Sequence, residues 1–481
     1  MKQTFTTTMP DQVGAFLLAD RCLTRLGLNI TRVSYNKAID THMLFLEVEG
    51  EEELLRQAEY ELAALGYLQN NHSAGSVMLI SFQLRDEPGA LCPVLELISR
   101  FHFNISYISS QENGTPYQDF KMGLFVDDSE AISDFMRQAA LLCPVQILEY
   151  SKSEKMLDNT VFYLNFANDI ARKMDFDDRQ TRELIVHSNK VMQLLEERNS
   201  PPYKTFEYIG KFADCIRRYR GEHFLPRVTR HTGAAGLVVT LIEPPCGSNL
   251  CFLDDGNAGH PLICVDSGFA CYREETLTLL RSLFPDFDSR EKILLLTHGD
   301  VDHCGLANDF DCVMGSRICL ENFRRENAGL AAVREENPLH EPYVRISKII
   351  SGYTSPNTGT FLPFPAPALA DSVLSKPVTV PVGPFCFSVY EGKGGHVAGE
   401  VILVEETHRL VFTGDIFVNV HAFTPEQAQF NTLAPYLMTS VDTNPALAKA
   451  EREAFRGLLS PGTWQVFGGH GSVLVLEIPT K

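Results

Sequence analysis

The stretch Leu294-Leu-Leu-Thr-His298-Gly-Asp300-Val-Asp302-His303-Cys-Gly305 joins an aliphatic run to a cluster of ligand-type residues. The aliphatic run predicts a buried strand, and two histidines and two aspartates fall within six positions at its end. A strand that delivers imidazole and carboxylate groups into the loop at its end builds a metal site on a rigid scaffold. This donor mixture suits zinc, iron or manganese. The simpler alternative is a polar turn that contains two histidines.

Three further motifs place ligand-type residues beside predicted strands. Gly394-Gly-His396-Val-Ala-Gly399 precedes a strand, Phe412-Thr-Gly-Asp415 follows one, and Phe467-Gly-Gly-His470-Gly follows another. Glycine beside each ligand lets the backbone turn sharply and approach a bound ion closely. Together with the opening stretch, these motifs predict one site assembled from distant parts of the chain.

The order of these motifs, with Asp266-Ser-Gly268 after an earlier predicted strand, resembles the metallo-β-lactamase superfamily over residues 230 to 477. The resemblance implies an αββα sandwich with two metal ions, zinc by family, in a cleft between the sheet edges. It also implies a hydrolase. The implied ligands are His298, Asp300 and His396 for the first ion, Asp302, His303 and His470 for the second, and Asp415 bridging both.

Residue 300 departs from the family pattern. The usual motif is His-x-His-x-Asp-His, whereas this chain has a carboxylate, Asp300, in place of the second imidazole. A carboxylate oxygen is a harder donor and adds a negative charge, which favours iron or manganese over zinc. Flavodiiron oxygen and nitric oxide reductases, with His-x-Glu-x-Asp-His before a small residue and Gly, resemble this chain here. The alternative function is therefore a diiron protein that binds, senses or reduces oxygen or nitric oxide.

Hydrolysis at two metal ions needs a positioned nucleophile and a proton donor for the leaving group. Asp302 is expected both to ligate an ion and to orient the nucleophile. His421, six positions after Asp415, and Tyr436 are candidate proton donors, with packing or surface exposure as the plainer interpretation of each. A structural metal site is the non-enzymatic alternative, but structural zinc sites are closed four-ligand sites, and seven ligands exceed that number.

The first 150 residues contain an internal repeat. Asp11-Gln-Val-Gly14-Ala is echoed by Asp86-Glu-Pro-Gly89-Ala, and Leu28-Asn-Ile30 is echoed by Phe103-Asn-Ile105, both at an offset of 75. Each repeat predicts the order βαββαβ, a split sheet with both helices on one face. The predicted helices are 15–26, 51–65, 90–101 and 129–142, and the predicted strands include 30–35, 42–49, 105–110 and 121–126.

Asp-x-x-Gly-Ala before a helix, followed by Asn-Ile and an aliphatic strand, resembles the ACT domain. The resemblance implies paired small-molecule sensors, usually for amino acids. Asp11, Gly14, Asp86 and Gly89 are the expected effector-binding residues, because glycine lets the backbone receive the charged ends of a ligand. The alternative is that these glycines only complete a turn. Ile108-Ser-Ser-Gln111 replaces the Glu-Ser-Arg-Pro motif of aromatic amino-acid enzymes, so an aromatic effector is not expected.

Residues 152–224 predict a helical connector with helices at 160–174, 178–199 and 204–219, where apolar residues recur at helical spacing. We expect this connector to pair two protomers in a homo-oligomer, a dimer. Alternating strands and helices follow from residue 225. Residues 320–380 predict a long, Pro-rich insertion with weak periodicity, which is typical of a lid or a flexible loop.

The composition excludes several classes of partner. The chain has 481 residues, of which 44% are hydrophobic and 21% charged, and its net charge of −19 argues against binding nucleic acid or an anionic membrane. We expect a cytoplasmic protein, because the N-terminus lacks the apolar stretch of a secretion signal and no segment approaches about 18 apolar residues. The twelve cysteines form no CxxC pair and are expected to be reduced.

These patterns predict a mixed α/β and α+β chain of four parts. The expected parts are ACT-like domains at 1–75 and 76–151, the helical connector at 152–224, and a metallo-β-lactamase-fold domain at 225–481. The expected function is a dinuclear metal-dependent hydrolase with a small-molecule substrate. A small-molecule effector, an amino acid, is expected to regulate it through the paired repeats.

Overall fold

The computed structural model describes residues 2–9, 13–36, 43–65, 77–111, 116–125, 130–151, 159–198, 202–233, 237–368, 372–433 and 441–480. The chain divides into two compact units. The N-terminal unit comprises Met1–Asp169 and Thr181–Pro202, and the C-terminal unit comprises Ile170–Gln180 and Tyr203–Lys481. Among the described residues, none of the helices combines the length and apolar character that a membrane crossing requires.

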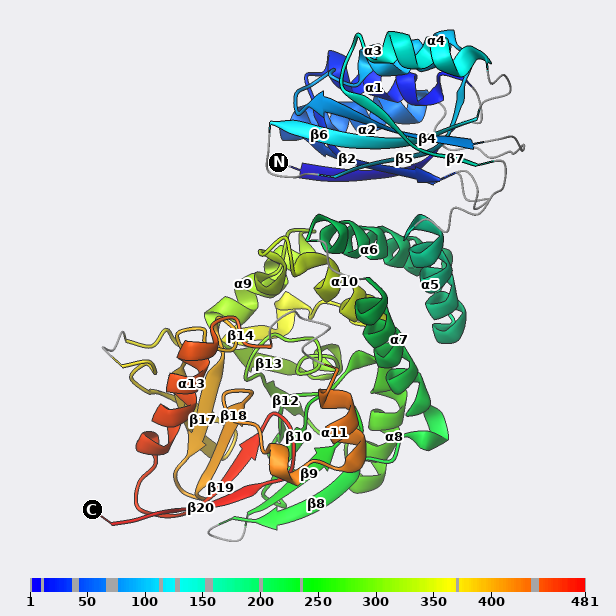
Figure 1. The fold of residues 1–481 in the computed structure, drawn as a ribbon. Coiled ribbons are helices and arrows are strands. Elements are labelled where there is room, and N and C mark those ends of the chain that lie inside the picture. The colour runs from blue at the N-terminus through cyan, green and yellow to red at the C-terminus, as the bar shows by residue number, and fades with distance from the viewer. Residues whose placement is uncertain are drawn as a thin grey trace. The chain divides into compact units, whose positions relative to one another are not determined.

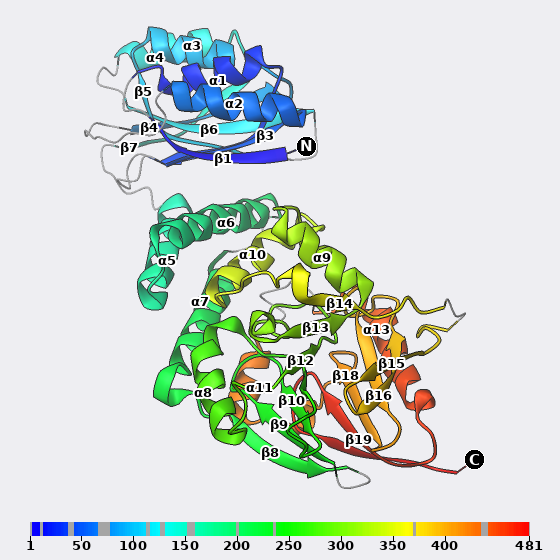
Figure 2. The same ribbon diagram turned by 180° about the vertical axis from the view of Figure 1, so that it is seen from behind.

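One seven-stranded antiparallel sheet forms the N-terminal unit, in the order β1-β3-β2-β5-β6-β4-β7. Its strands are β1 (Lys2–Thr8), β2 (Asn29–Asn36), β3 (Met43–Glu49), β4 (Val77–Arg85), β5 (Asn104–Gln111), β6 (Tyr117–Phe125) and β7 (Val145–Ser151). Helices α1 (Ala15–Arg25), α2 (Glu52–Ala64), α3 (Cys92–Arg100) and α4 (Glu130–Ala139) cover one face (Figures 1 and 2). The predicted βαββαβ order is confirmed for the second repeat, whereas the closing strand of the first would fall in 66–76, outside the described residues.

The two repeats join through equivalent strands. β2 pairs antiparallel with β5, and Ser34 lies opposite Ser109, its counterpart at the repeat offset of 75. The glycine turns follow the same symmetry, because a Cβ at Gly14 would contact Ser99 and a Cβ at Gly89 would lie 2.9 Å from Thr24. Both glycines have positive φ, 80° and 82°. Glycine therefore serves the left-handed turn at both positions and, at Gly89, the close packing of the two repeats.

Three helices follow, within two residues of the predicted bounds: α5 (Asn159–Met174), α6 (Asp178–Glu197) and α7 (Pro202–Arg218). Within the C-terminal unit, α7 packs Phe212 against Phe269 and Phe430, with ring centroids 6.3 and 5.8 Å apart. The Tyr272 hydroxyl also donates to the Ile216 carbonyl of this helix at 3.0 Å. The pairing of protomers through these helices stays a prediction.

Two sheets form the C-terminal unit. The first has the order β14-β13-β12-β11-β10-β9-β8, parallel from β11 to β14, and the second runs β15-β16-β17-β18-β19-β20 with only β18 and β19 parallel. The strands of the first are β8 (Arg227–Thr232), β9 (Val238–Glu243), β10 (Leu250–Asp254), β11 (Leu262–Val265), β12 (Lys292–Leu295), β13 (Cys312–Gly315) and β14 (Phe361–Pro363). Those of the second are β15 (Val378–Val382), β16 (Phe385–Glu391), β17 (Val401–Glu405), β18 (Leu410–Gly414), β19 (Gly462–Gly468) and β20 (Leu474–Ile478).

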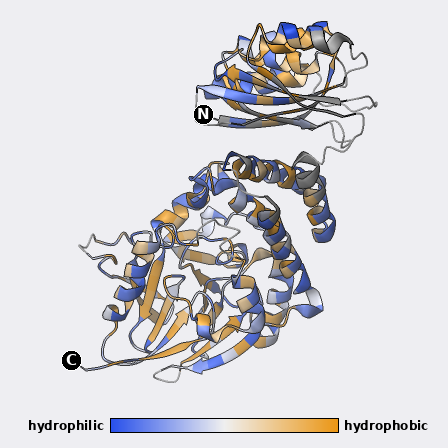
Figure 3. Cartoon of the chain, viewed as in Figure 1, coloured by the Kyte–Doolittle hydropathy of each residue, from blue (hydrophilic) through white to orange (hydrophobic). Residues whose placement is uncertain are grey.

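The two sheets pack face to face with helices outside them. One core cluster draws on both sheets, with Leu241 and Leu295 from the first and Phe387 and Phe412 from the second. Helices α8 (Arg273–Leu283) and α9 (Arg317–Asn327) contribute to the core on the outer face of the first sheet. Helix α13 (Pro445–Ala454) and the buried Trp464 contribute to the core of the second. Figure 3 shows the central strands as largely hydrophobic, as expected of strands buried on both faces.

The insertion at residues 320–380 differs from the prediction of a loop. It contains most of α9 and all of α10 (Glu341–Ile350), both α-helices. Tyr343, Ile346 and Ile350 are buried at helical spacing on α10, so the periodicity is present but short. The Pro-rich segment after it obscured this pattern.

Candidate metal centre

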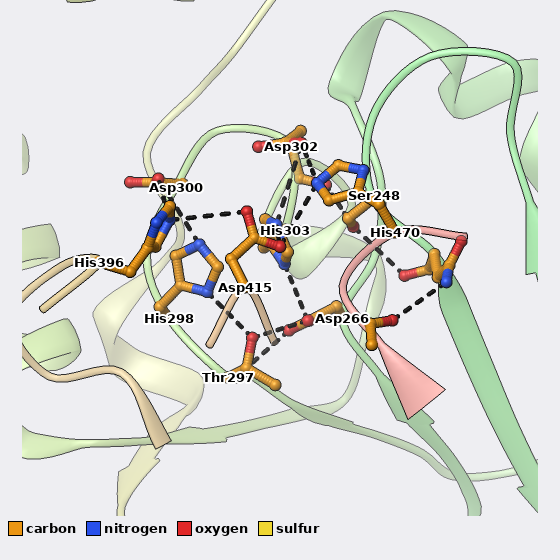
Figure 4. A network of polar contacts seen from close by, with 12 residues as sticks. Ser248, Asp266, Thr297, His298, Asp300, Asp302, His303, His396, Asp415 and His470 are labelled. Carbon is orange, nitrogen blue, oxygen red and sulfur yellow. Dashed lines mark hydrogen bonds and ion pairs between the residues drawn. The ribbon is translucent and has the colours of Figure 1, made fainter. Parts of the chain in front are cut away.

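Four loops at strand ends bring the predicted ligands of the C-terminal unit together (Figure 4). The loop after β12 carries residues 298 to 303, and the loop before β17 carries His396. The loops after β18 and β19 carry Asp415 and His470. All four imidazoles are buried, with 0–6% of their surface exposed. The strands therefore place side chains from distant parts of the sequence at one edge of the sandwich.

The first group of ligands surrounds Asp300. Its Oδ2 lies 3.6 Å from His298 Nε2 and 3.4 Å from His396 Nε2. Asp415 Oδ2 lies 3.6 Å from the same His396 nitrogen. The donor atoms of His298, Asp300 and His396 are close enough to share one ion.

The second group surrounds Asp302. Its Oδ2 lies 3.9 Å from His303 Nε2 and 3.5 Å from His470 Nε2. Asp415 presents its other oxygen, Oδ1, at 3.5 Å from each of these two nitrogens. One carboxylate thus faces both groups, one oxygen to each, as the figure shows.

Hydrogen bonds fix the orientation of every imidazole. Each Nδ1 has an oxygen partner outside the cluster, which leaves each Nε2 directed inward. The partners are Thr297 Oγ1 for His298 (3.1 Å), Asp266 Oδ2 for His303 (2.8 Å), Asp442 Oδ1 for His396 (3.0 Å) and the Gly247 carbonyl for His470 (3.0 Å). When Nδ1 donates, a neutral imidazole has its lone pair on Nε2, the form that binds a metal ion.

Several inward-facing atoms are buried without a hydrogen-bond partner among the described residues. They are Nε2 of His298, Nε2 of His303 and Oδ1 of Asp415. Buried polar atoms nearly always have partners, so three orphaned atoms in one cluster indicate a missing species. Asp415 Oδ1 carries a lone pair, and each Nε2 carries one when its ring is neutral, so a cation satisfies all three. The residues therefore fit a metal site.

Asp266 explains the early Asp-Ser-Gly motif. Its carboxylate accepts hydrogen bonds from the Thr297 amide (2.9 Å), the Thr297 hydroxyl (2.7 Å) and His303 Nδ1. Its φ of 58° lies in the left-handed region, which aspartate tolerates better than most residues. Asp266 thus orients one imidazole directly and a second through Thr297.

Glu400 holds the loop that carries Asp415. Its Oε1 accepts from the amides of Asp415 (2.8 Å) and Ile416 (3.0 Å), and its side chain is buried. His298 Nδ1 lies 3.6 Å from the same oxygen. Glu400 therefore positions Asp415 without facing the centre of the cluster.

The cluster shifts the pKa of its own members in the metal-free state. Burial alone would raise the pKa of Asp415, but His470 and His303 hold it well below its usual range. Burial lowers the pKa of His303, yet Asp302, Asp415 and Asp266 raise it well above its usual value. Opposed charges within the cluster thus stabilise one another.

His396 shows the same balance. Burial lowers its pKa, but Glu400 and hydrogen bonds to Asp300 and Asp442 raise the pKa to about 10. Protons and metal ions therefore compete for this nitrogen.

Arg334 contacts the cluster and was not predicted from the sequence. Its guanidinium donates to both carboxylate oxygens of Asp300, from Nε to Oδ1 at 3.0 Å and from Nη2 to Oδ2 at 2.6 Å. It also donates to His396 Nε2 (3.0 Å) and to the Val441 carbonyl (2.9 Å). No motif surrounds Arg334 in the insertion, so the sequence carried no signal for this contact.

Glu400 and Asp442 were also missed, with different signals. Glu400 directly follows Gly399 of a quoted motif, so its place in the cluster could have been suspected. Asp442 lies two residues before Asn444, the N-cap of α13, and its partner His396 is distant in sequence.

A cavity of about 360 Å³ opens beside the cluster. Asp300, Asp302, His396, Asp415 and His470 line one end. Most of the remaining lining is apolar, and the lining comes from α7, α9, α10, the helix α11 (Pro425–Asn431) and surrounding loops. The apolar lining is Phe212, Phe269, Val301, Ala332, Val333, Val344, Val397, Ala398, Val418, Val420, Phe423, Phe430 and Val441.

The predicted catalytic residues have different positions. Asp302 lines the cavity. His421 is exposed and does not line it, although Val420 and Phe423 on either side do. Tyr436 lies outside the described residues. His421 as the proton donor stays a prediction.

Three of the predicted effector residues, Gly14, Asp86 and Gly89, are described and lie in the N-terminal unit. The fourth, Asp11, falls outside the described residues. The Asp86 carboxylate accepts from Asn29 and Gln118, each at 2.8 Å. Asp86 and Gly89 line a small cavity of about 20 Å³, which holds a water molecule but no amino acid. Effector binding here stays a prediction.

No protein-family model matches the chain, and no curated protein matches it. Three solved structures illustrate what it is similar to. The BLEG-1 B3 metallo-β-lactamase has 16% identity over 52% of this chain and 94% of its own, with a TM-score of 0.27. AidC, a dizinc quorum-quenching lactonase, has 14% identity over 57% and 86%, with a TM-score of 0.30. Aspartate kinase from Synechocystis has 13% identity over 30% and 28%, with a TM-score of 0.24.

The described residues form a mixed α/β protein with several sheets. The similarity to metallo-β-lactamase fold proteins covers about half of the chain, and the similarity to aspartate kinase covers 30% of it. Its His/Asp clusters are consistent with a metal site.

Proposed function

We propose that the C-terminal unit is a dinuclear metal-dependent hydrolase. His298, Asp300 and His396 would hold one ion, Asp302, His303 and His470 the other, and Asp415 would bridge them. The observation that carries the proposal is Asp415, whose two oxygens face the two groups separately. The orphaned Nε2 atoms of His298 and His303 support it.

The chemistry follows from the ligand set. When bound, two divalent ions lower the pKa of a water molecule and stabilise negative charge that develops on the substrate. Asp302, whose side chain is 18% exposed at the cavity wall, orients the attacking water and accepts its proton. Asp266 and Glu400 keep His303 and Asp415 in place, which limits reorganisation during the reaction.

The cavity favours a neutral substrate with an apolar group. Apart from the cluster histidines, the cations among its described lining residues are Arg334 and Lys348, and both are paired. Arg334 binds Asp300, and Lys348 Nζ donates to Glu326 (2.7 Å) and Glu335 (2.6 Å). Neither is available to a phosphate, whereas Phe212 and Phe430 offer apolar contact. A carboxylic ester, thioester or lactone with an apolar acyl chain fits this lining better than a phosphodiester.

Elemental analysis and turnover test the proposal together. The purified protein is expected to contain two divalent ions per chain and to hydrolyse acyl esters, thioesters or lactones in preference to phosphodiesters. Asp415→Ala is expected to lose both ions and turnover, because it removes the shared ligand. Wild-type protein without bound metal after reconstitution with zinc would refute the dinuclear site.

A diiron oxygen- or nitric oxide-binding protein is the second candidate, and Asp300 favours it. Its carboxylate is a harder donor than the imidazole that the resemblance would place there. Protein purified without oxygen separates the two functions. Iron with an absorption change on exposure to oxygen supports the diiron protein, and zinc alone excludes it.

We also propose that a small molecule, an amino acid, regulates the enzyme through the tandem repeats. Among the described residues, Asp20 Oδ2 and Gln118 Oε1 have no hydrogen-bond partner, and both side chains are buried and line the small cavity between the repeats. A ligand with N–H donors would satisfy both atoms once the cavity opens. A rise in melting temperature with one amino acid, absent in Asp20→Ala, is the expected result.

A further inference from the structure

The unusual carboxylate at position 300 has a matching cation. Arg334 contacts both oxygens of Asp300, a two-point geometry that fixes the plane of the carboxylate. The Arg334 side chain is only 12% exposed and that of Asp300 11%, so the pair is largely screened from water. A buried pair of this kind interacts more strongly than a surface pair, and removal of one partner leaves an uncompensated charge.

The charge count of the ligand set changes with Arg334. Asp300, Asp302 and Asp415 contribute three negative charges, whereas an imidazole at position 300 would leave two. The positive charge of Arg334 restores the lower value. We propose that Arg334 is a positioning residue that neutralises Asp300, so that the first group of ligands holds a zinc-type divalent ion as an imidazole set would. This inference rests on the proposed dinuclear site.

The contacts are compatible with a bound ion. Each carboxylate oxygen has two lone pairs, so Asp300 Oδ2 can contact Arg334 and an ion together. In its neutral form His396 Nε2 has a single lone pair, so its contact with Arg334 would give way to a bound ion. The bonds of Arg334 to Asp300 Oδ1 and to the Val441 carbonyl involve no atom of this contact, so they would hold the guanidinium in place.

The insertion holds Arg334 firmly. The next residue, Glu335, is buried and accepts from Lys348 Nζ (2.6 Å), from Arg345 (2.8 Å) and from the amide of Ala332 (3.1 Å). Lys348 and Arg345 both lie on α10. The helical insertion that replaces the predicted loop thus supplies the cation and fixes its position.

Metal titration tests the inference without relying on turnover. Zinc affinity and stoichiometry are measured by competition with a chelating dye, and cobalt absorption spectra report the coordination of each ion. Arg334→Met is expected to bind one ion as tightly as the wild type and the other about 10- to 100-fold more weakly. Arg334→Lys keeps the positive charge but loses the two-point contact. Its affinity for the weakened ion is expected to lie between those of the wild type and Arg334→Met.

A double-variant cycle gives the sharper result. Asp300→His alone places an imidazole beside an unpaired arginine. This variant is expected to bind the first ion more weakly. Asp300→His with Arg334→Met removes both charges and is expected to restore two tight ions. Arg324 is an exposed arginine on α9, and Arg324→Met is the control for the change in net charge.

Each outcome decides something different. The role of Arg334 is overturned if Arg334→Met binds two ions as tightly as the wild type. It is also overturned if the double variant binds zinc no more tightly than Asp300→His. Either result leaves the dinuclear site intact. If the wild type binds one ion and Arg334→Met binds two, the guanidinium occupies the place of an ion. That result also overturns the proposed role of Arg334. No ions in the wild type refutes the proposed function itself. Unfolding followed by circular dichroism shows that each variant is folded.

Discussion

Single hydrogen bonds decide the chemistry of the four cluster imidazoles. Each ring donates Nδ1 to an oxygen outside the cluster, so each Nε2 lone pair points inward. The acceptors differ: two carboxylates, one hydroxyl and one backbone carbonyl. Substitution of an acceptor therefore tests ring orientation without removing a ligand.

Asp266→Asn is expected to weaken metal binding about 10- to 100-fold while the fold persists. Asparagine tolerates the positive φ at this position but offers only one acceptor oxygen, so His303 loses its charged partner. Zinc affinity from competition titration measures the effect. Asp288→Asn, which removes an exposed carboxylate paired with Arg281, is the matched control. Equal affinities in the two variants would contradict the role of Asp266.

The stabilisation of the protein by zinc is expected to grow between pH 6.5 and 8.5. In the metal-free protein the pKa of His396 is about 10, above its usual 6.5. A raised histidine pKa stabilises the folded state fully below pH 6.5, and this contribution is lost as the pH rises through 10. Zinc binds only the unprotonated ring, so its affinity increases over the same range. The difference in melting temperature with zinc and with chelator measures this, and a constant or shrinking difference would contradict it.

Strand ends and their glycines are the elements that assemble the site. Gly469, after β19, packs against Asp415 and His303, and a Cβ there would collide with Asp415 Oδ1 and lie 2.9 Å from His303 Cε1. The backbone thus approaches the ligands as closely as the motif predicts. The loop has no room for a side chain on this face.

Gly469→Ala is expected to abolish or greatly weaken metal binding, because the added methyl group displaces two ligands. Gly457→Ala is the control, since a Cβ at that position meets nothing within 4 Å. Metal content after dialysis against zinc distinguishes the two variants. Full metal content in Gly469→Ala would show that the loop can move away.

Strands such as β11, β12 and β18 could be predicted because they are buried aliphatic runs that end in ligand motifs. β13 and β14 could not, because these short strands neither form an aliphatic run nor end in a ligand motif. The clustering of the seven predicted ligands could be anticipated for the same reason as the strands: each stands in a glycine-containing motif. Arg334 was not, because its contact with Asp300 depends on how α9 and α10 pack, and no local pattern encodes that.

At the scale of the whole molecule, the two compact units give separate reporters of unfolding. Trp464 is the single tryptophan of the chain and is buried in the C-terminal unit, in a core cluster of the second sheet. Its indole donates to the Ser460 carbonyl at 2.8 Å. Its fluorescence therefore reports the unfolding of the unit that carries the candidate metal centre.

Removal of metal is expected to lower the unfolding temperature reported by Trp464 fluorescence. A ligand that binds only the folded state raises its stability, and chelation removes that gain. The transition of the N-terminal unit, followed by backbone circular dichroism, is expected to stay unchanged. A fluorescence transition that is insensitive to chelator would argue against a metal site in this unit.

The approximate symmetry of the N-terminal sheet gives any molecule that docks at its seam two related but unequal places to bind. Ser99 stands beside one glycine turn and Thr24 beside the other, so the two places differ by a methyl group and by their flanking side chains. A titration should then resolve two affinities. Exchange of these two residues should swap which place fills first.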